Sequence, residues 1–240
     1  MSDPEPQADS QPDRAIRRLD EFEQPVGPPL DGWVPPPQPP RSQMAGRYVQ
    51  LVPVDVEAHA APLFVAFDEP KDWSYLWQGP FDDVESYTTW MRAACTGDDP
   101  LVHTIMVDGS PVGLASYLRI DANVGSIEVG GLHFSPALQR TPASTEAMFL
   151  MMERAFQLGY RRYEWKCDAL NAPSRAAAAR LGFTYEGIFR QATIYKQRSR
   201  DTAWFSIIDS EWPSLRAEFT RWLDPANFDT DGSQRTPLNT

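Results

Sequence analysis

The stretch "LQRTPASTEA", residues 138–147, has the residue types of an anion-binding site. Thr141 is a favourable helix N-cap, and Pro142 suits the first helical position, where its missing N–H costs nothing. A helix start leaves main-chain N–H groups unpaired and carries about half a positive charge. The amides that follow the proline, helped by the hydroxyls of Ser144 and Thr145, would hold a phosphate without any glycine. The alternative is an ordinary capped helix.

Two further features accompany this loop. Gly130 and Gly131 interrupt an apolar strand at residues 125–136, and glycine inside a strand is typical of a bulge or of close approach by another group. A kinked strand leaves main-chain groups free for a ligand. The segment "NAPSRAAAARLGF", residues 171–183, then places Asn171 at the exit of the next strand, ahead of a short helix of small residues.

These residues need an alternating α/β scaffold to hold them. Period-two and helical patterns predict strands at residues 46–54, 101–107, 112–120, 125–136, 161–167, 183–189 and 202–209, and helices at 55–67, 81–95, 142–158, 174–180 and 211–223. The first helix is expected to break near Pro62. Residues 108–111, "DGSP", predict a hairpin turn, and Gly159 predicts the left-handed end of the long helix.

The composition predicts one soluble globular domain with tails. With 240 residues, 42% of them hydrophobic, the chain can bury one sizeable core. We expect a disordered tail at 1–24, a proline-rich strap at 25–43, the domain at 44–223 and a flexible C-terminal tail at 224–240. The "PPPQPP" run within the strap is alternatively a docking ligand for a partner.

Charge and cysteine usage exclude some classes of function. A net charge of −11 argues against nucleic-acid binding and suits cationic substrates such as amines. No apolar run approaches the roughly 18 residues needed to cross a membrane. The start "MSDPEPQADS" lacks a signal-peptide pattern, and there are two cysteines, Cys95 and Cys167, so we expect a reducing cytoplasm. No metal is expected.

The order of these features resembles the GNAT superfamily of N-acetyltransferases, in particular its RimJ/RimL-like branch, over about residues 44–210. In that branch the acetyl-CoA loop commonly reads Gln-Gly-Lys-Gly-x-Ala-Thr-Glu-Ala, and residues 139–147 match it without a gap. The segments "YEG" at 185–187 and "RDTAWFSI" at 200–207 are also similar. The resemblance implies an α/β fold with a mixed, mostly antiparallel sheet of about seven strands, splayed at the fourth strand and flanked by helices.

The resemblance further implies acetyl transfer from acetyl-CoA to a primary amine, on a small molecule or a protein N-terminus, by direct attack in a ternary complex. The pantetheine arm would pair with the main chain of residues 132–134, Asn171 would bind the arm from the other side, and Ser174 would protonate the leaving thiolate. The pyrophosphate would bind residues 139–145. The implied cofactor residues are Leu132, His133, Phe134, Gln139, Arg140, Thr141, Ala143, Ser144, Thr145, Asn171 and Ser174.

The chain also departs from the family pattern. Arg140 and Pro142 stand at the two loop glycines, and the Arg140 guanidinium is a candidate to meet phosphate directly. Ala178 stands where many members carry a general-acid tyrosine. Thr193 stands where enzymes acting on ribosomal N-termini can use a glutamate.

The attacking amine must be neutral, so a base is needed, directly or through water. Glu128, two residues before Gly130, is the candidate catalytic base; the alternative is an exposed strand carboxylate in a surface ion pair. A main-chain N–H near Leu132 or His133 would meet the oxyanion. The His133 ring is interpreted as a packed neutral ring rather than a base, and Ser174 is alternatively structural.

Substrate selection is expected in the loop between the first two helices. Trp73, Tyr75, Trp77 and Phe81 lie there among acidic residues that could hold a cation. The alternative is that half of these rings pack the helices onto the sheet. A second function also stays open, a catalytically weak acyl-CoA-binding or protein-interaction module. The oligomeric state is not determined, a homodimer included.

Overall fold

The structure, a computed structural model, describes residues 18–230 and 232–238. The chain divides into two units, residues 1–34 and 35–240. The predicted tail at 1–24 lies mostly outside the described residues. None of the described helices is both long enough and apolar enough to span a bilayer.

The first unit contains a small antiparallel hairpin. It pairs β1 (Arg18–Leu19) with β2 (Pro25–Val26). The Asp20 carboxylate holds the turn because it accepts hydrogen bonds from two main-chain N–H groups within it.

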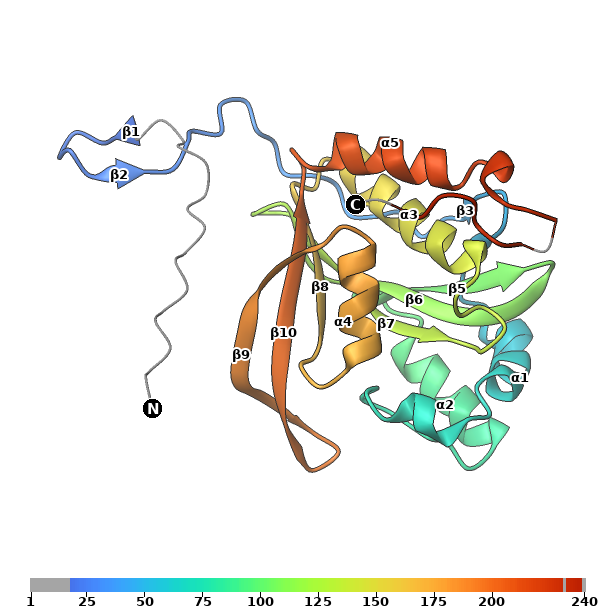
Figure 1. Cartoon of the computed structure of the whole chain (residues 1–240). Coiled ribbons are helices and arrows are strands. Elements are labelled where there is room, and N and C mark those ends of the chain that lie inside the picture. The colour runs from blue at the N-terminus through green and yellow to red at the C-terminus, as the bar shows by residue number, and fades with distance from the viewer. Residues whose placement is uncertain (1–17, 231, 239–240) are drawn as a thin grey trace, which may run out of the picture. The chain divides into compact units, whose positions relative to one another are not determined.

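The second unit is built on one large sheet, shown in Figure 1. Its strands are β3 (Met44–Ala45), β4 (Gln50–Pro53), β5 (Leu101–Val107), β6 (Ser110–Asp121), β7 (Ser126–Phe134), β8 (Arg162–Asp168), β9 (Thr184–Tyr195) and β10 (Arg198–Ile208). They are arranged in the order β3-β4-β5-β6-β7-β8-β10-β9. Every pair is antiparallel except β7 with β8, which is parallel. The prediction of a mixed, mostly antiparallel sheet is confirmed.

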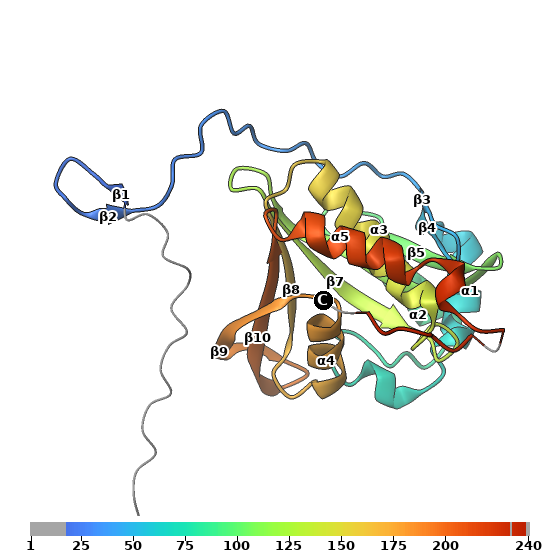
Figure 2. The same ribbon diagram turned by 45° about the horizontal axis from the view of Figure 1, so that its top comes forward.

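Helices cover both faces of this sheet (Figures 1 and 2). They are α1 (Val56–Ala66), α2 (Val84–Ala94), α3 (Pro142–Gln157), α4 (Ala172–Arg180) and α5 (Trp212–Trp222), with short 3-10 turns η1 (Pro70–Trp73) and η2 (Pro225–Asn227). One core packs α3, α4 and α5 onto the sheet, and it includes Ile127 and Val129 of β7. The other core packs α1 and α2 against the opposite face.

The sheet has eight strands where the sequence predicted about seven, because residues 44–53 form two short strands instead of one. The Glu146 carboxylate of α3 accepts hydrogen bonds from the main-chain N–H groups of Arg47, Tyr48 and Val49 at 2.9, 2.6 and 3.0 Å. These three donors turn toward one acceptor, so the chain bends between β3 and β4. A signal carried by a residue about 100 positions away cannot be read from local periodicity.

The first helix does not break at Pro62. Helix α1 runs through the proline, which removes one hydrogen bond but lies on the exposed side. Buried Ala60, Leu63 and Phe67 hold the helix against α2 on both sides of it. The predicted turns at Asp108-Gly109 and the helix end at Gly159 are confirmed, since all three residues have a positive φ.

The C-terminal segment beyond residue 223 differs from the expected flexible tail. Asn227 is buried, and its amide donates to the carbonyls of Trp222 and Thr236. The Phe228 ring packs edge-on against Trp222, with centroids 5.0 Å apart. This segment therefore covers the end of α5 instead of leaving the domain.

The proline-rich stretch is held in its second half, from residue 35 onward. Pro36 and Pro39 are buried, and Tyr160 donates to the carbonyl of Pro37. Arg154 of α3 donates to the carbonyls of residues 42 and 43 at 2.8 and 2.7 Å.

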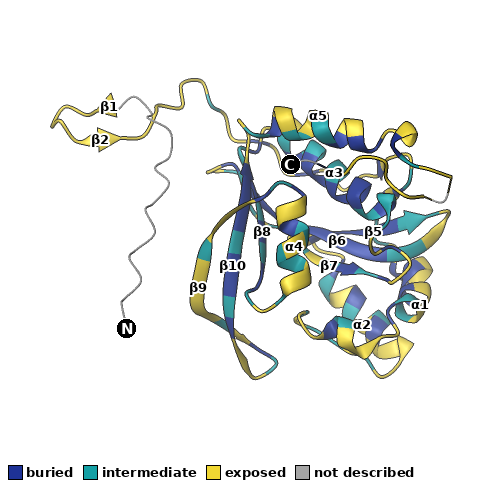
Figure 3. Ribbon diagram, in the orientation of Figure 1, coloured by how far each residue is buried: buried dark blue, intermediate teal, exposed yellow. Residues whose placement is uncertain are grey.

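Strand β9 forms one edge of the sheet, and most of its residues are exposed to solvent (Figure 3).

Candidate functional site

The two parallel strands separate in the middle of the sheet. Cα pairing between β7 and β8 runs from Ser126 with Arg162 to Val129 with Trp165 and then stops, although β7 continues to Phe134. Directly after β7, the Ser135 N–H donates to the Val112 carbonyl of β6. By antiparallel alternation the main-chain groups of His133 therefore face β6, while those of Phe134 turn toward the gap. This gap is the predicted splay at the fourth strand, counted from the predicted 46–54 strand.

A bulge in β7 creates the separation. The register shifts between the pairs Leu114 with His133 and Ser116 with Gly130, so extra residues lie opposite Ala115. Gly131 has φ +58°, and a Cβ there would lie 2.8 Å from the Ser116 Oγ. The two glycines thus mark a bulge, as the sequence indicated.

The loop from 135 to 141 presents main-chain N–H groups beside this gap. Among the described residues, the N–H groups of Arg140, Thr141 and Ala143 make no hydrogen bond. The Ser144 Oγ already donates to the Thr141 carbonyl, whereas the Thr145 Oγ1 accepts from Arg180 and keeps its own proton. The candidate anion site of this loop is therefore made mainly of backbone.

Gln139 and Arg140 complete the loop in different ways. The Gln139 side-chain amide donates to the Phe134 carbonyl at 2.7 Å, so it ties the loop to the end of β7. Arg140 is exposed and adopts φ +61°, the backbone conformation for which glycine is preferred. The loop thus keeps the glycine-like geometry with an arginine at that position.

Replacing Arg140 separates its backbone role from its charge. A non-glycine residue in the left-handed region costs roughly 1 to 2 kcal/mol, so Arg140→Gly should be about 1 kcal/mol more stable than Arg140→Ala. Both variants lose the guanidinium, so both should bind acetyl-CoA about tenfold more weakly than the wild type if it meets phosphate. Urea unfolding and calorimetric titration measure the two effects. Equal stability of the two variants would contradict the backbone role of Arg140. An unchanged affinity for acetyl-CoA would contradict a contact between its guanidinium and phosphate.

Asn171 and Ser174 lie at the start of α4, next to the gap. The Asn171 Oδ1 caps the helix by accepting from Ser174 N at 3.1 Å, and its Nδ2 makes no hydrogen bond to the described residues. Ser174 Oγ accepts from Trp165 Nε1 at 3.0 Å. Burial raises the pKa of Cys167, and a hydrogen bond from Ser174 opposes that rise. Ser174 is thus held between two β8 side chains, which supports its structural alternative.

Glu128 is not the free or exposed carboxylate that the sequence suggested. It is 2% exposed and lies on the sheet face opposite Ile127 and Val129. Arg119 donates to both of its oxygens, and Lys166 Nζ lies 2.9 Å from Oε2. A general base needs an available lone pair at the reacting proton. With two cations on this carboxylate, Glu128 is the centre of a buried ion-pair cluster, and its role as a base stays a prediction.

The His133 side chain is a packed neutral ring, in agreement with its interpretation from the sequence. The ring stacks on Phe67, with centroids 3.5 Å apart, and meets Trp73 edge-on at 4.4 Å. Burial lowers the pKa of His133 to about 3 and that of His103 to about 4. His59, the third histidine of the chain, also has a lowered pKa because of burial. His133 and His103 are therefore poor bases near neutral pH.

These lowered pKa values predict that the folded protein becomes less stable as the pH falls. The unfolded histidines bind protons below about pH 6.5, whereas the folded His133 and His103 stay neutral until pH 3 to 4. The contribution of the two neutral rings to the free energy of unfolding is complete above pH 6.5 and is lost as the pH falls. At pH 5 the free energy of unfolding should be lower than at pH 7 by about 2 kcal/mol for each of the two.

Urea unfolding at both pH values measures this loss, and His133→Phe should reduce it by about half. Glu164 and Glu186 do not interfere, since their lowered pKa values act below about pH 4.5. The same free energy at pH 7 and pH 5 would show that the buried rings accept protons in the folded state.

The four aromatic residues of the predicted substrate loop divide into two pairs. Trp73 is 3% exposed and Phe81 packs 5.4 Å from it in the α1–α2 core. Tyr75 and Trp77 are 39% and 58% exposed. Half of the rings therefore pack the helices, and the other half are available to a substrate.

The loop carrying Tyr75 and Trp77 reaches the β9–β10 hairpin. Tyr75 donates to the Leu170 carbonyl at 3.1 Å, and the Trp77 ring lies 5.6 Å from that of Tyr195. Lys196 of the hairpin donates to the Trp73 carbonyl at 2.6 Å. Sequence reasoning did not include this hairpin in the site, although four cations between residues 190 and 200 were a visible signal.

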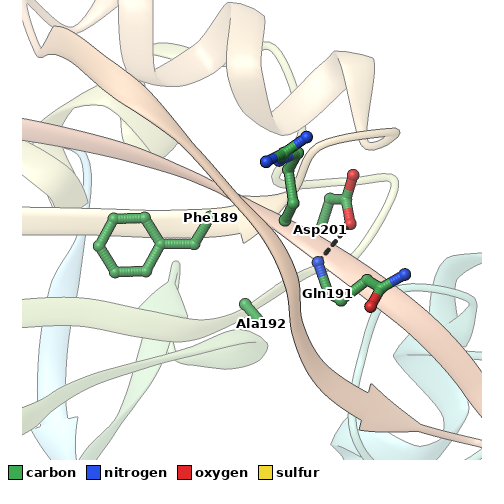
Figure 4. Close-up of a pocket in the computed structure, with 5 residues that line it drawn as sticks. Phe189, Gln191, Ala192 and Asp201 are labelled. Atoms are coloured by element: carbon green, nitrogen blue, oxygen red, sulfur yellow. Dashed lines mark hydrogen bonds between the residues drawn. The ribbon is translucent and has the colours of Figure 1, made fainter.

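An open depression of about 740 Å³ lies at the outer edge of this hairpin (Figure 4). It is lined by Phe189, Arg190, Gln191, Ala192 and Asp201. The Gln191 N–H donates to the Asp201 carboxylate, which fixes the β9 bulge. The depression contains none of the predicted site residues. Within the described residues, no cluster of three or more His, Cys, Asp or Glu side chains could hold a metal.

Comparison with known proteins agrees with this geometry. Residues 49–184 match the acetyltransferase (GNAT) domain. The crystal structure of a GCN5-related N-acetyltransferase from Brucella melitensis is 43% identical, with a TM-score of 0.85, over 87% of this chain and 97% of that one. That of a probable GNAT-family acetyltransferase from Chromobacterium violaceum is 40% identical, with a TM-score of 0.76, over 79% and 98%.

A more distant likeness concerns the fold alone. Mycobacterium smegmatis RimJ, in complex with CoA-disulfide, is 22% identical, with a TM-score of 0.59, over 72% of this chain and 88% of that one. The comparison with curated proteins gave no match. The separated β7 and β8, the backbone anion loop before α3 and the match over more than half of the chain lead to one conclusion: this protein belongs to the GNAT acetyltransferase family.

Proposed function

We propose that this protein transfers an acetyl group from acetyl-CoA to a primary amine by direct attack in a ternary complex. The observation that carries the proposal is the loop at 139–143, whose unpaired N–H groups lie at the end of a strand that has left its neighbour. A helix start of this kind binds a pyrophosphate, and an open strand binds the amide groups of a pantetheine arm. Acetyl-CoA carries both groups.

In this mechanism the residues of the chain position the cofactor, and a solvent water molecule acts as the base that takes the proton of the amine. Phe134 offers its main-chain N–H to the arm, since Gln139 donates to its carbonyl, and the Nδ2 of Asn171 offers a donor from the other side. Glu128 is engaged by two cations and burial lowers the pKa of His133 to about 3. The attacking amine therefore loses its proton to water. An α-amine, with a pKa near 7.7, is a better acceptor at neutral pH than a lysine-type amine near 10.4.

The RimJ/RimL-like branch is part of the proposal. It is supported by the loop at 139–147, by "YEG" at 185–187 and by the fold of RimJ. Thr193 in place of a glutamate favours acceptors other than ribosomal N-termini.

Asn171 provides the test of cofactor binding. Asn171→Asp keeps the capping oxygen and removes the Nδ2 donor, so its stability should equal that of the wild type while acetyl-CoA affinity falls by about 1 to 3 kcal/mol. Asn171→Ala loses the donor and also the cap, which costs about a further 1 kcal/mol of stability. Calorimetric titration and thermal unfolding of both variants measure this. Unchanged affinity in both would place the arm elsewhere.

A second candidate is a catalytically weak acyl-CoA-binding module. It is favoured by Ala178, which is fully buried where many relatives carry a tyrosine, and by the engaged Glu128 and Ser174. Steady-state thiol release with a panel of amines, amino acids and peptides separates the two functions. An enzyme releases CoA well above background with at least one acceptor, and a binding module with none.

A further inference from the structure

Arg200 of β10 is a largely buried cation without an ion-pair partner. It is 8% exposed, and its Nε is closed off from solvent with no acceptor. Within residues 18–230 and 232–238 its side chain makes no hydrogen bond and no ion pair. Arg162, in the same half of the sheet, shows the usual arrangement, because it pairs with Glu164 and Glu186. A buried, unpaired guanidinium is unfavourable unless something else supplies the acceptors.

Aromatic rings define the space around Arg200. Its guanidinium lies 5.7 Å from the Trp77 ring and 5.8 Å from the Tyr195 ring. Tyr195 is fixed by a hydrogen bond to Asp168 at 2.9 Å, whereas Trp77 is 58% exposed. Arg200 thus lies under a ring of the α1–α2 loop that is open to solvent on its other side.

The segment that carries Arg200 is positively charged in a chain of net charge −11. The segment 190–200 contains four cations and no acidic residue. Two carboxylates occur at neighbouring strand positions, but Asp168 accepts from Tyr195 and the Leu170 N–H, and Asp201 accepts from the Gln191 N–H. Among the described residues neither carboxylate forms an ion pair with Arg200, so its donors stay available to an incoming anion.

Arg200 also lies near the gap between β7 and β8. Thr202, two residues further along β10, pairs with Asp168 at the end of β8. The charge of Arg200 acts on the Cys167 thiol, which the Ser174 hydroxyl contacts. Arg200 therefore borders the end of the gap where α4 begins.

We propose that Arg200 binds an anionic group, a carboxylate or a phosphate, on the amine that accepts the acetyl group, with Trp77 covering it. The inference rests on the proposed function and specifies its acceptor. It replaces the cationic substrates suggested by overall charge with acceptors that carry an amine and an anion together. The guanidinium fork suits both oxyanions, and its donors would be satisfied on binding.

Matched acceptor pairs test this inference. Thiol release is measured at saturating acetyl-CoA with alanine against alaninamide, and with O-phosphoethanolamine against ethanolamine. The wild type should favour the charged member of one pair by about tenfold or more in kcat/KM, and that pair identifies the anion. Arg200→Gln should reduce the preference to about twofold or less, and Arg198→Gln, at an exposed position nearby, should keep it. Equal rates within both pairs would overturn the proposal.

A binding measurement covers the case in which none of these amines is acetylated. The thermal midpoint of the acetyl-CoA-saturated protein is measured in acetate, phosphate and chloride at one ionic strength. Acetate or phosphate should raise it above chloride in the wild type and in Arg198→Gln, but not in Arg200→Gln. No such rise in the wild type, or the same rise in all three proteins, would overturn the proposal.

Two controls separate this inference from other roles. Without ligand, Arg200→Gln should be as stable as the wild type or more stable, because an unpaired charge is removed; a clear loss of stability would mean that Arg200 is structural. Its acetyl-CoA affinity should be unchanged, and a drop would assign Arg200 to the cofactor instead. If the wild type itself fails to bind acetyl-CoA, the proposed function fails and this inference with it.

Discussion

Replacing Glu146 by alanine should lower the free energy of unfolding by about 3 to 5 kcal/mol. The carboxylate is 5% exposed and accepts from three consecutive main-chain N–H groups. The turn follows it so closely that a Cβ on Gly46 would lie 2.3 Å from its Oε2. Water cannot replace these bonds without opening the contact between α3 and the β3–β4 turn. The thermal midpoint should fall by roughly 10 °C.

Two variants make this prediction specific. Glu153→Ala removes a carboxylate from the same helix, paired with a half-exposed Arg216, and should cost no more than about 1 kcal/mol. Glu146→Gln keeps one acceptor oxygen but turns an NH₂ toward N–H donors, so it should lie between the wild type and Glu146→Ala. If Glu146→Ala unfolds within about 2 °C of the wild type, the three-donor contact does not hold the turn.

The β7 bulge gives the second large effect. Gly131→Ala places a Cβ at φ +58°, 2.8 Å from Ser116 Oγ, while Gly130→Ala meets the flexible end of Leu118 at 2.9 Å and Glu128 Oε1 at an ordinary contact distance of 3.4 Å. Both variants lose a glycine in the same strand, so their difference reports the backbone conformation. Gly131→Ala should be about 1 to 2 kcal/mol less stable than Gly130→Ala. Urea unfolding measures the difference.

The same pair should also separate acetyl-CoA binding. Straightening the bulge moves residues 132–134 away from the gap, so Gly131→Ala should bind acetyl-CoA at least about tenfold more weakly than Gly130→Ala. If both variants bind alike, the bulge does not set the position of the strand.

Much of the scaffold could be predicted because its signals are local. The helix start at Thr141-Pro142, the turns at Asp108-Gly109 and Gly159 and the strand glycines each depend on nearby residues. Both strands of the β9–β10 hairpin were predicted, but their extension over residues 190–201 was missed because the turn residues, Lys196 and Gln197, take positive φ values without the glycine or asparagine that usually marks such a turn. Glu146 accepts hydrogen bonds from main-chain N–H groups about 100 residues away, and such a contact leaves no local pattern in the sequence.

The candidate site was predictable in its backbone and less so in its side chains. The bulge at Gly130-Gly131 and the helix start at Thr141 follow from residue type, and both are present. The assignment of residues 132–134 to the pantetheine arm came from the family resemblance and stays a prediction. The role of Glu128 depends on Arg119 and Lys166, which approach it across the sheet. Arg200 was missed for the converse reason, because only the fold reveals that this side chain is largely buried and that its Nε has no acceptor.

Crystallography of the protein grown with excess acetyl-CoA tests the central claim most directly. The account predicts the cofactor between β7 and β8, its pyrophosphate on the N–H groups of Arg140, Thr141 and Ala143 and its arm along the main chain near Phe134. A gap that stays empty at saturating cofactor, or acetyl-CoA bound at another place, would contradict it.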